Sequence, residues 1–561
     1  MAMRVLIVGG VAGGASAAAR LRRLDESAEI IVFERGPHVS FANCGLPYFL
    51  SGEIATKDKL LVQTPERLKA VFNLDVRIRS EVVSIDRPSQ VVTVRDLANG
   101  REYQERYDAL VLSPGASPIV PPIPGVDRPG IFTLRNIPDL TRIDDWITSK
   151  RAKRAVVGGG GYIGLEVAEQ LKRRGLDVTL AQSSSQVLIQ FDPEIAAYVH
   201  AELRKHGINL LLGQPVVGFE EPTTDDAASS VVLMKNGGRV PADVVVLGLG
   251  VKPEVKLARA VGLTVGELGG IRVDDHLRTS DPAIYAVGDA VEVRDLVTGK
   301  WALMALAGPA NRMGRIVADN IAGRDSNYEG SLGTAIVRVF DLTAASTGAN
   351  EATLKKAGIP YQVVHLHPNS HAGYYPGAKS IAMKLLFAPD TGKLLGAQAV
   401  GEDGVDKRID VLATALKAGM TVHDLADLEL AYAPPFGSAK DPINLAGMAA
   451  QNVLAGDVRV AQWHEVEQLD PELVTILDVR DIQERAAGSI ANSVHVPLPE
   501  LRERISELPR NRELLVHCAS GQRSYIACRM LQQHGFRCRN LTGSYKTWQK
   551  ATVDRLSNTL P

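Results

Sequence analysis

The sequence predicts a multidomain α/β protein with two βαβ nucleotide-binding units, an α+β module and a small C-terminal α/β unit. Two strand–glycine turn–helix–strand patterns, at residues 4–34 and 154–182, predict the first two units. From about residue 331 the pattern changes to alternating strands followed by a helix, and a separate α/β pattern follows the segment 446–462. A chain of 561 residues is long enough for several such domains.

The composition of the chain argues against a nucleic-acid-binding, membrane or secreted protein. The chain has 63 Lys and Arg against 64 Asp and Glu, which gives no overall attraction to nucleic acid or an acidic membrane. The first residues, MAMRVLIVGG, lack the features of a secretory signal, and no apolar run reaches the roughly 18 residues of a membrane span. We therefore expect a cytoplasmic protein whose partners are small molecules. Four cysteines without zinc-site spacing predict neither a disulfide scaffold nor a metal site.

The first βαβ unit consists of RVLIVG, a glycine turn, the helix ASAAARLRRL and the strand EIIVFE. Gly9 allows a tight turn and Gly14 allows helix and strand to approach closely, so that helix N-terminal amides face a pyrophosphate. Val11 stands where the middle glycine is usual, and Glu34 ends the second strand, where a carboxylate binds ribose hydroxyls. The residues predicted to bind this cofactor are Gly9, Val11, Ala12, Gly13, Gly14, Glu34 and Arg35.

The second unit satisfies the GxGxxG pattern fully, from Gly159 to Gly164. The usual position of the ribose-binding acid holds Gln182, followed by three serines. No carboxylate there selects the 2′-hydroxyl of NADH, and no arginine receives the 2′-phosphate of NADPH. Because an uncompensated phosphate is costly to bury, NADH is favoured and NADPH stays open. The predicted contacts are Gly159, Gly161, Tyr162, Ile163, Gly164, Glu166, Gln182 and Gly250.

Two cysteines have the surroundings of reactive thiols. Cys44 lies in HVSFANCGLPYFLSG, and position 49 is Phe49, so no neighbouring cysteine can close an internal disulfide. Its redox partner must be an external sulfur, or oxygen in a sulfenic acid. Cys518 ends an apolar strand and begins the loop ASGQRS, whose amides at a helix N-terminus lower a thiol pKa and can hold a persulfide. Cys528 and Cys538 have no such loop and are expected to be structural.

The pattern SFxxCGxPY, together with HAGYYPGAK and AYAPPFGSAKDP, resembles the coenzyme A (CoA) disulfide and persulfide reductases of the pyridine nucleotide–disulfide oxidoreductase family. The resemblance covers about residues 1–450, and Gly288-Asp289 after TSDPAIYAV resembles the second flavin motif of that family. The spacing Cys-x4-Arg-Ser after Cys518, with LDVRDIQER at residues 477–485, resembles rhodaneses. Gly488-Ser489-Ile490 departs from the rhodanese Gly-His-Ile.

The resemblance implies FAD and NADH as cofactors, CoA thiols as substrates and a homodimer. It implies that Cys44 forms a mixed disulfide with CoA, and that Cys518, with Arg523, transfers sulfane sulfur. Tyr374 and Tyr432 would assist a leaving thiolate in the partner's site, and Tyr375 could replace Tyr374. The further flavin residues implied are Ser113, Gly115, Gly288, Asp289 and Ala305, and the CoA residues are Arg20, Arg23, Ser40, Asn43 and Lys440.

The expected domains follow in order along the chain. They are the first part of an FAD-binding domain at 1–150, an NAD(P)H-binding domain at 151–255, the second part of the FAD-binding domain at 256–330, a dimerisation domain at 331–450, a linker at 451–462 and a rhodanese domain at 463–561. The fold class is therefore α/β, with two Rossmann-like domains, an α+β dimerisation domain and a C-terminal rhodanese domain.

The expected function is NAD(P)H-dependent, FAD-dependent reduction of CoA disulfide, CoA persulfide or polysulfide through Cys44, with sulfur transfer by Cys518 and release of CoA and sulfide. The sequence leaves the choice among these substrates, the direction of sulfur transfer and the mobility of the rhodanese domain open. An NADH oxidase or peroxidase that uses a cysteine sulfenic acid is the first alternative. A non-catalytic redox sensor or sulfur-carrier scaffold is the second.

Overall fold

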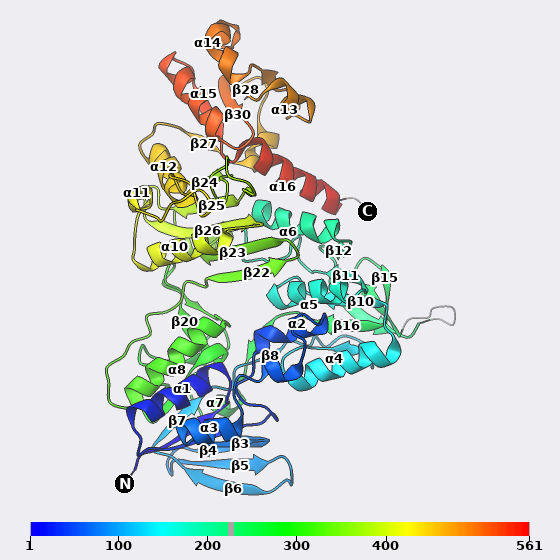
Figure 1. Cartoon of the computed structure of the whole chain (residues 1–561), viewed down its shortest axis with the longest axis vertical. Coiled ribbons are helices and arrows are strands. Elements are labelled where there is room, and N and C mark those ends of the chain that lie inside the picture. The colour runs from blue at the N-terminus through cyan, green and yellow to red at the C-terminus, as the bar shows by residue number, and fades with distance from the viewer. Residues whose placement is uncertain (1, 223–228, 560–561) are drawn as a thin grey trace. The chain divides into compact units, whose positions relative to one another are not determined.

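The computed structural model describes residues 2–222 and 229–559, so the outermost ends of the first and last expected domains lie outside it. The chain forms two compact units (Figure 1). The first unit comprises Met1–Ser183 and Ile208–Gly333, and the second comprises Ser184–Gly207 and Thr334–Pro561. Each unit contains more than one of the expected domains.

A five-stranded parallel sheet forms the centre of the first βαβ domain. Its strand order is β19-β7-β1-β2-β3, and Val5, Leu6 and Ile7 are fully buried, as expected for a parallel sheet covered on both faces. The strands are β1 (Arg4–Val8), β2 (Glu29–Glu34), β3 (Asp75–Ile78), β7 (Ala109–Leu112) and β19 (Ile284–Ala286). The sheet therefore joins residues from both parts of the expected FAD-binding domain.

Two helices pack closely beside this sheet. Helix α1 (Ala12–Leu24) lies against α8 (Ala307–Ile321), and both carry small residues where they meet. A Cβ on Gly314 would stand 2.3 Å from the carbonyl oxygen of Gly13. The glycine in α8 is therefore required for the two helices to approach at this point.

A second parallel sheet, of order β12-β11-β10-β16-β9, confirms the expected second βαβ unit. Its strands are β9 (Ile131–Phe132), β10 (Arg154–Gly158), β11 (Asp177–Ala181), β12 (Asn209–Leu211) and β16 (Val244–Leu247). Helix α5 (Tyr162–Arg173) connects β10 to β11, and α4 (Ile137–Lys150) begins at an Asn136–Asp139 capping box.

Short strands and helices complete the first unit. The strands are β4 (Ser80–Asp86), β5 (Val91–Asp96), β6 (Glu102–Arg106), β8 (Ala116–Pro118), β13 (Val216–Glu220), β14 (Ser230–Met234), β15 (Arg239–Ala242), β17 (Val251–Pro253), β18 (Ile271–Arg272), β20 (Val291–Arg294) and β21 (Trp301–Ala302). The helices are α2 (Leu46–Leu50), α3 (Pro65–Phe72) and α7 (Lys256–Ala260).

The second unit contains an antiparallel sheet of order β22-β23-β26-β25-β24. The strands are β22 (Ala335–Val339), β23 (Leu342–Gly348), β24 (Gln362–Leu366), β25 (Ala382–Phe387) and β26 (Leu394–Gly401). Helices α10, α11 and α12 share one apolar core with this sheet. The helices of this module are α9 (Glu351–Ala357), α10 (Val405–Lys417), α11 (Val422–Asp427) and α12 (Pro442–Leu454).

The C-terminal module has a parallel sheet of order β27-β31-β30-β28-β29. The strands are β27 (Val460–Ala461), β28 (Val474–Asp478), β29 (Val494–His495), β30 (Glu513–His517) and β31 (Cys538–Leu541). The helices are α13 (Ile482–Ala486), α14 (Leu501–Arg504), α15 (Gln522–Gln533) and α16 (Ser544–Thr559). Cys518 follows β30 directly and therefore lies at the carboxyl end of a central strand.

Helix α6 (Pro193–Lys205) falls within the range expected for the NAD(P)H-binding domain, yet it belongs to the second unit. A buried ion pair and a buried hydrogen bond explain this difference. Glu194 lies 2.5 Å from the fully buried Lys384 of β25, and His200 lies 2.7 Å from Asp554 of α16. Charges buried in this way are costly without their partners, so these pairs tie α6 to the second unit.

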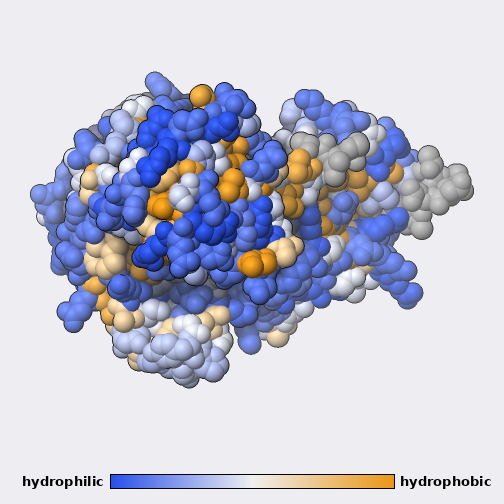
Figure 2. All heavy atoms as spheres, turned by 90° about the horizontal axis from the view of Figure 1, so that it is seen from above, coloured by the Kyte–Doolittle hydropathy of each residue, from blue (hydrophilic) through white to orange (hydrophobic). Residues whose placement is uncertain are grey.

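Hydrophilic side chains cover most of the face seen in Figure 2, and hydrophobic side chains appear among them in small groups. Among the described residues, no helix combines the length and apolar character that crossing a membrane requires.

Candidate active sites

The first glycine turn is shaped by close backbone contacts. Gly9 has a φ of +96°, and a Cβ there would stand 2.1 Å from the carbonyl oxygen of Ser113. A Cβ on Gly14 would stand 1.9 Å from the carbonyl oxygen of Gly9. Only glycine fits at either position, so α1 begins immediately above the strand ends, with its N-terminal amides beside the turn.

Glu34 lies at the carboxyl end of β2 and stabilises this turn. Its carboxylate accepts hydrogen bonds from the amides of Gly10 (3.0 Å) and Gly36 (2.7 Å). The neighbouring Arg35 is exposed and lies 3.7 Å from Glu254. Glu34 thus stands at the strand end where a ribose-binding acid is expected.

Three separated segments meet beside the turn. A Cβ on Gly13 would lie 3.0 Å from the hydroxyl of Ser113 and 3.0 Å from Val287, which precedes Gly288. Gly288 has a φ of +77°, and Asp289 follows it in a short 3₁₀ turn. Burial raises the pKa of Asp289, against the opposing charge of Arg135. The structure therefore brings both proposed flavin motifs to one place, whose glycine cradle fits the pyrophosphate and ribitol of a flavin dinucleotide.

The remaining residues that were predicted to contact the flavin lie at the edges of this region. Gly115 has a φ of +71°, and a Cβ on it would lie 3.7 Å from the guanidinium of Arg135. Ala305 is exposed, two residues before α8 begins. Arg135 was not anticipated from the sequence, because it comes from a segment without a recognised motif.

The second glycine turn repeats the geometry of the first. Gly159 has a φ of +102°, and a Cβ on Gly164 would stand 1.9 Å from the carbonyl oxygen of Gly159. The side-chain oxygen of Gln182 accepts a hydrogen bond from the amide of Gly160 at 3.0 Å. Gln182 therefore occupies the place that Glu34 holds in the first turn, with a neutral amide instead of a carboxylate.

Other predicted contacts of the second turn surround the start of α5. Tyr162 is partly exposed and Ile163 is 40% exposed. Gly250 has a φ of +98° and lies beyond the end of β16. Glu166 accepts a hydrogen bond from the hydroxyl of Tyr48 at 2.9 Å.

Cys44 stands in a 3₁₀ turn, Asn43–Gly45, that leads into α2. Its side chain is exposed, and α2 packs against α5 of the second nucleotide-binding unit. Burial by surrounding atoms raises the pKa of the Cys44 thiol, and the charges of Glu166 and then Asp289 raise it further. Glu166 lies in α5, two residues after Gly164, and Asp289 lies in the second flavin motif. The turn that holds Cys44 therefore leads into a helix packed on the second nucleotide-binding unit.

The residues expected to contact CoA have different surroundings. Arg20 forms an ion pair with Asp319 at 2.7 Å, whereas Arg23 and Asn43 are exposed. Ser40 has a φ of +45°, and its amide donates to the carbonyl of Gly10 at 2.8 Å. Lys440 is exposed in the second unit.

Tyr374 and Tyr432 meet in the second unit. Their hydroxyls lie 3.0 Å apart, although the residues are 58 positions apart in the sequence. Tyr374 is 77% exposed and Tyr432 is 47% exposed. The hydrogen bond between the two hydroxyls raises the pKa of Tyr374, because it stabilises the protonated phenol. Tyr375 instead turns its ring edge toward His371.

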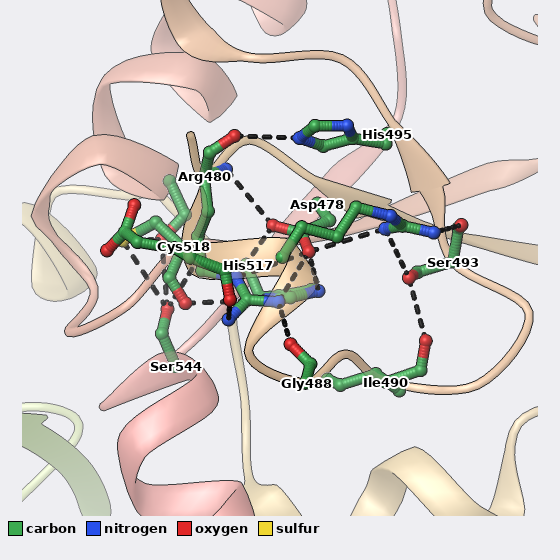
Figure 3. Close-up of polar contacts among 12 residues, drawn as sticks. Asp478, Arg480, Gly488, Ile490, Ser493, His495, His517, Cys518 and Ser544 are labelled. Carbon is green, nitrogen blue, oxygen red and sulfur yellow. Dashed lines mark hydrogen bonds and ion pairs between the residues drawn. The ribbon is translucent and has the colours of Figure 1, made fainter. Parts of the chain in front are cut away.

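The Cys518 loop surrounds a buried sulfur with donors (Figure 3). Sγ accepts hydrogen bonds from the amide of Gly521 (3.1 Å) and the hydroxyl of Ser524 (3.4 Å). The thiol itself donates to the hydroxyl oxygen of Ser544 at 3.8 Å. Burial alone would raise the pKa of Cys518, but hydrogen bonds from Ser524, Gly521 and Ser520 outweigh it and lower the pKa. The loop thus favours a thiolate or a terminal persulfide anion.

Arg523 and the DVR segment stand beside this loop. Arg523 forms ion pairs with Glu484 (2.7 Å) and Asp481 (3.2 Å). Arg480 donates to the buried carboxylate of Asp478 at 2.7 Å and to the carbonyl of Gly488 at 2.8 Å (Figure 3). These bonds hold the loop that follows β28 against the strand. Burial lowers the pKa of His517, the residue before Cys518, to about 4.

The fold and these sites define a nucleotide-dependent thiol oxidoreductase joined to a sulfurtransferase-like module. The pyridine nucleotide-disulphide oxidoreductase family matches residues 3–314, its dimerisation domain matches residues 334–441, and the rhodanese-like domain matches residues 461–551. The chain therefore belongs to the pyridine nucleotide-disulphide oxidoreductase family and carries a C-terminal rhodanese-like domain. Membership implies FAD and NAD(P)H as cofactors.

Three similar proteins refine this assignment. The structure of reduced CoADR-RHD from Bacillus anthracis is 48% identical, with a TM-score of 0.96 and 99% of each chain covered. An NAD-dependent persulfide reductase from A. fulgidus is 40% identical, with a TM-score of 0.91 and coverage of 97% of this chain and 100% of that one. The coenzyme A disulfide reductase of Staphylococcus haemolyticus is 37% identical over 80% of this chain and its own full length.

Proposed function

We propose that this protein is an FAD-dependent NAD(P)H reductase of CoA disulfide, CoA persulfide or polysulfide that uses Cys44 as its single redox thiol. The observation that carries the proposal is the position of Cys44, in the turn that leads into α2, from which the hydroxyl of Tyr48 donates to Glu166 of α5 at 2.9 Å. A thiol between two nucleotide sites is suited to pass an electron pair from a nicotinamide to an external disulfide. The names of the relatives support CoA as the carrier of that disulfide.

The proposed reaction balances with one NADH. The Cys44 thiolate attacks one sulfur of CoA disulfide, forms a mixed disulfide and releases one CoA thiolate, which takes a proton. The glycine turn at Gly9–Gly14 and the segment of Asp289 would hold FAD, which would supply a route for the electron pair of the nicotinamide hydride to the mixed disulfide. Cleavage returns the Cys44 thiolate and releases the second CoA. NADH, a proton and CoA disulfide therefore give NAD⁺ and two CoA, whereas CoA persulfide gives CoA and hydrogen sulfide.

The protein groups around Cys44 bear on its protonation. Burial, and then the charges of Glu166 and Asp289, raise the pKa of the thiol and favour its protonated form. Formation of a mixed disulfide removes that penalty, since the disulfide is uncharged. The site is therefore suited to hold Cys44 in the oxidised, CoA-bound state between turnovers.

The two hydrogen-bonded tyrosines are the proposed proton donors. Each leaving CoA thiolate needs a proton, and a positioned hydroxyl can supply it. The hydroxyls of Tyr374 and Tyr432 lie 3.0 Å apart, so either can donate while the other stabilises the phenolate by a hydrogen bond. Both side chains are exposed within the chain, and we infer that a homodimer brings them to the Cys44 site of the partner subunit.

Exposed positive charges are the proposed contacts for the CoA phosphates. Arg23 and Lys440 have exposed side chains, and Asn43 is exposed beside Cys44. Ser40 lies in the same segment, with its amide bonded to Gly10. Arg20 can contribute only if its ion pair with Asp319 opens or accommodates a phosphate beside it.

NADH is the proposed nicotinamide cofactor. Gln182 stands at the ribose position with its oxygen bound to the amide of Gly160. A neutral amide side chain can form hydrogen bonds with the ribose hydroxyls of NADH, but it does not supply the positive charge that a 2′-phosphate requires. NADPH use is expected to be weaker. It stays possible because Gln182 is neutral and does not repel the 2′-phosphate as a carboxylate would.

The rhodanese-like domain is proposed to carry sulfane sulfur on Cys518. Its lowered pKa supports a thiolate that accepts sulfur from a donor, and the surrounding donors support the resulting persulfide anion. Arg523 would add positive charge at the loop, although it also binds Glu484. Both centres on one chain raise their effective concentration for sulfur exchange in either direction.

Steady-state NADH consumption separates this proposal from an NADH oxidase or peroxidase. We expect turnover with CoA persulfide or CoA disulfide to exceed turnover with hydrogen peroxide or oxygen alone, and Cys44→Ser to abolish it. Faster turnover on peroxide would favour the sulfenic acid alternative. Negligible turnover with every acceptor would favour a redox sensor or sulfur-carrier scaffold.

A further inference from the structure

We propose that Arg408 is the positioning residue that sets the Tyr374–Tyr432 pair, by clamping the two loops that carry these tyrosines. The inference rests on the proposed role of the tyrosines. Arg408 lies in the first turn of α10 and is only 2% exposed, so it is placed to act through its neighbours and not by touching the substrate.

The first loop is anchored at Ser370. The guanidinium of Arg408 donates to the carbonyl oxygen of Ser370 at 2.8 Å. Ser370 is 1% exposed and closes the base of the loop, because its backbone and hydroxyl bond to Lys379. Tyr374 stands midway between these two residues, so a shift of the loop base moves its ring.

The second loop is anchored at Asp441. Arg408 donates through Nη2 to one carboxylate oxygen at 2.8 Å and through Nε to the other at 3.3 Å. Asp441 is 3% exposed and caps α12 by accepting from the amide of Ile443. The segment before it carries Tyr432, so this ion pair fixes the loop at its helix end.

The same guanidinium thus bonds to the base of each loop. The loops also touch directly, since the amide of Ala372 donates to the carbonyl of Gly437 at 2.8 Å. A fourth hydrogen bond from Arg408 reaches the carbonyl of Gly404, which precedes its own helix. In Figure 1, α10 and α12 lie beside the same sheet, with which they share a core.

Arginine is required for this geometry. Its planar fork presents five N–H groups in fixed directions, which serve a carboxylate and two carbonyls together. A lysine at the same position keeps the charge but has one compact ammonium group, which cannot satisfy all three acceptors in this arrangement. Lys407 lies 3.8 Å from Asp441, so part of the charge balance survives the substitution.

A double-mutant cycle on the full-length holoenzyme tests the inference. We expect Arg408→Lys to lower kcat with CoA disulfide about 10- to 100-fold, because a displacement of about 1 Å in a positioned group has this effect. We expect the rate of flavin reduction by NADH and the sulfurtransferase rate of Cys518 to stay within about twofold, because neither uses the tyrosines. In a Tyr374→Phe/Tyr432→Phe background, Arg408→Lys should cause no further loss.

The outcomes are distinguishable. If the tyrosine variant is slow and Arg408→Lys lowers kcat by the same factor in both backgrounds, the positioning inference is overturned while the tyrosine role stands. If the tyrosine variant turns over at the wild-type rate, the proposed function of the pair fails and the inference with it. Arg204→Lys is the matched control, because Arg204 bonds Asp554 in the same unit but holds neither tyrosine loop.

Asp441→Asn perturbs the ion pair between Arg408 and Asp441 at the carboxylate. Asparagine still accepts the amide bond that caps α12, but it removes the charge that Arg408 binds. We expect the same non-additivity with the tyrosine variant. This variant decides the question if Arg408→Lys does not fold, and an additive loss would again overturn the inference.

Discussion

Gly161→Ala isolates the pyrophosphate contact of the second nucleotide site. Gly161 precedes α5 with φ −80° and ψ −174°, a backbone that alanine adopts easily, and among the described residues no heavy atom lies within 4 Å of its added Cβ. We therefore expect stability to stay unchanged. The methyl group points into open space that the proposed pyrophosphate would need.

The expected loss of affinity follows from contact distances. A phosphate oxygen approaches a backbone amide to about 2.9 Å, closer than the roughly 3.4 Å at which a methyl carbon makes ordinary contact. The nucleotide must then recede and lose at least one hydrogen bond to a charged group, worth about 1.5 to 3 kcal/mol. This corresponds to a rise of about 10- to 150-fold in the NADH concentration at half-saturation.

Anaerobic stopped-flow flavin reduction against NADH concentration measures this effect. Gly164→Ala is the informative comparison, since its Cβ would stand 1.9 Å from a backbone oxygen and should also lower the melting temperature. A Gly161→Ala protein with the wild-type NADH dependence would refute the reasoning and remove the pyrophosphate from this turn.

Three further predictions concern the rhodanese-like domain. Cys518→Ser should abolish sulfur transfer to cyanide yet leave NADH-dependent reduction of CoA disulfide within about twofold; loss of both would show that the centres do not act separately. The thiolate of Cys518 is lost as pH falls through its lowered pKa. Ser524→Ala removes a donor to the sulfur and should therefore move the acid limb of the pH–rate profile to higher pH; an unmoved limb contradicts this origin of the shift. Arg480→Met should lower the free energy of unfolding of the domain by about 3 to 5 kcal/mol in denaturant unfolding, because it removes the main partner of the buried Asp478. Arg512→Met, at an exposed ion pair, is the control and should lower it by less than about 1 kcal/mol.

The geometry of the two glycine turns could be predicted from the sequence because it is local. Gly9 and Gly159 have positive φ, and Gly14 and Gly164 have no room for a Cβ. Both requirements are met by glycine, so both can be recognised in the sequence. The spacing to Glu34 and Gln182 likewise follows from one strand, one helix and the next strand. Each of these side chains bonds to the amide of a turn glycine.

The parts that escaped prediction depend on tertiary packing. Adjacent tyrosines at 374 and 375 could not be ranked from the sequence, because the choice depends on which hydroxyl reaches Tyr432. Ser544 reaches Cys518 from the start of α16, outside any recognised motif. Helix α6 follows a nucleotide-domain strand in the sequence, but its buried Glu194 and His200 find their partners in the second unit.

The central claim is that Cys44 exchanges electrons with a small-molecule thiol, and intact-protein mass spectrometry of the oxidised enzyme tests it directly. We predict an adduct with the mass of CoA that maps to Cys44, that NADH releases stoichiometrically, and that Cys44→Ser lacks. An unmodified Cys44 after incubation with CoA disulfide, with NADH turnover intact in Cys44→Ser, would contradict the account.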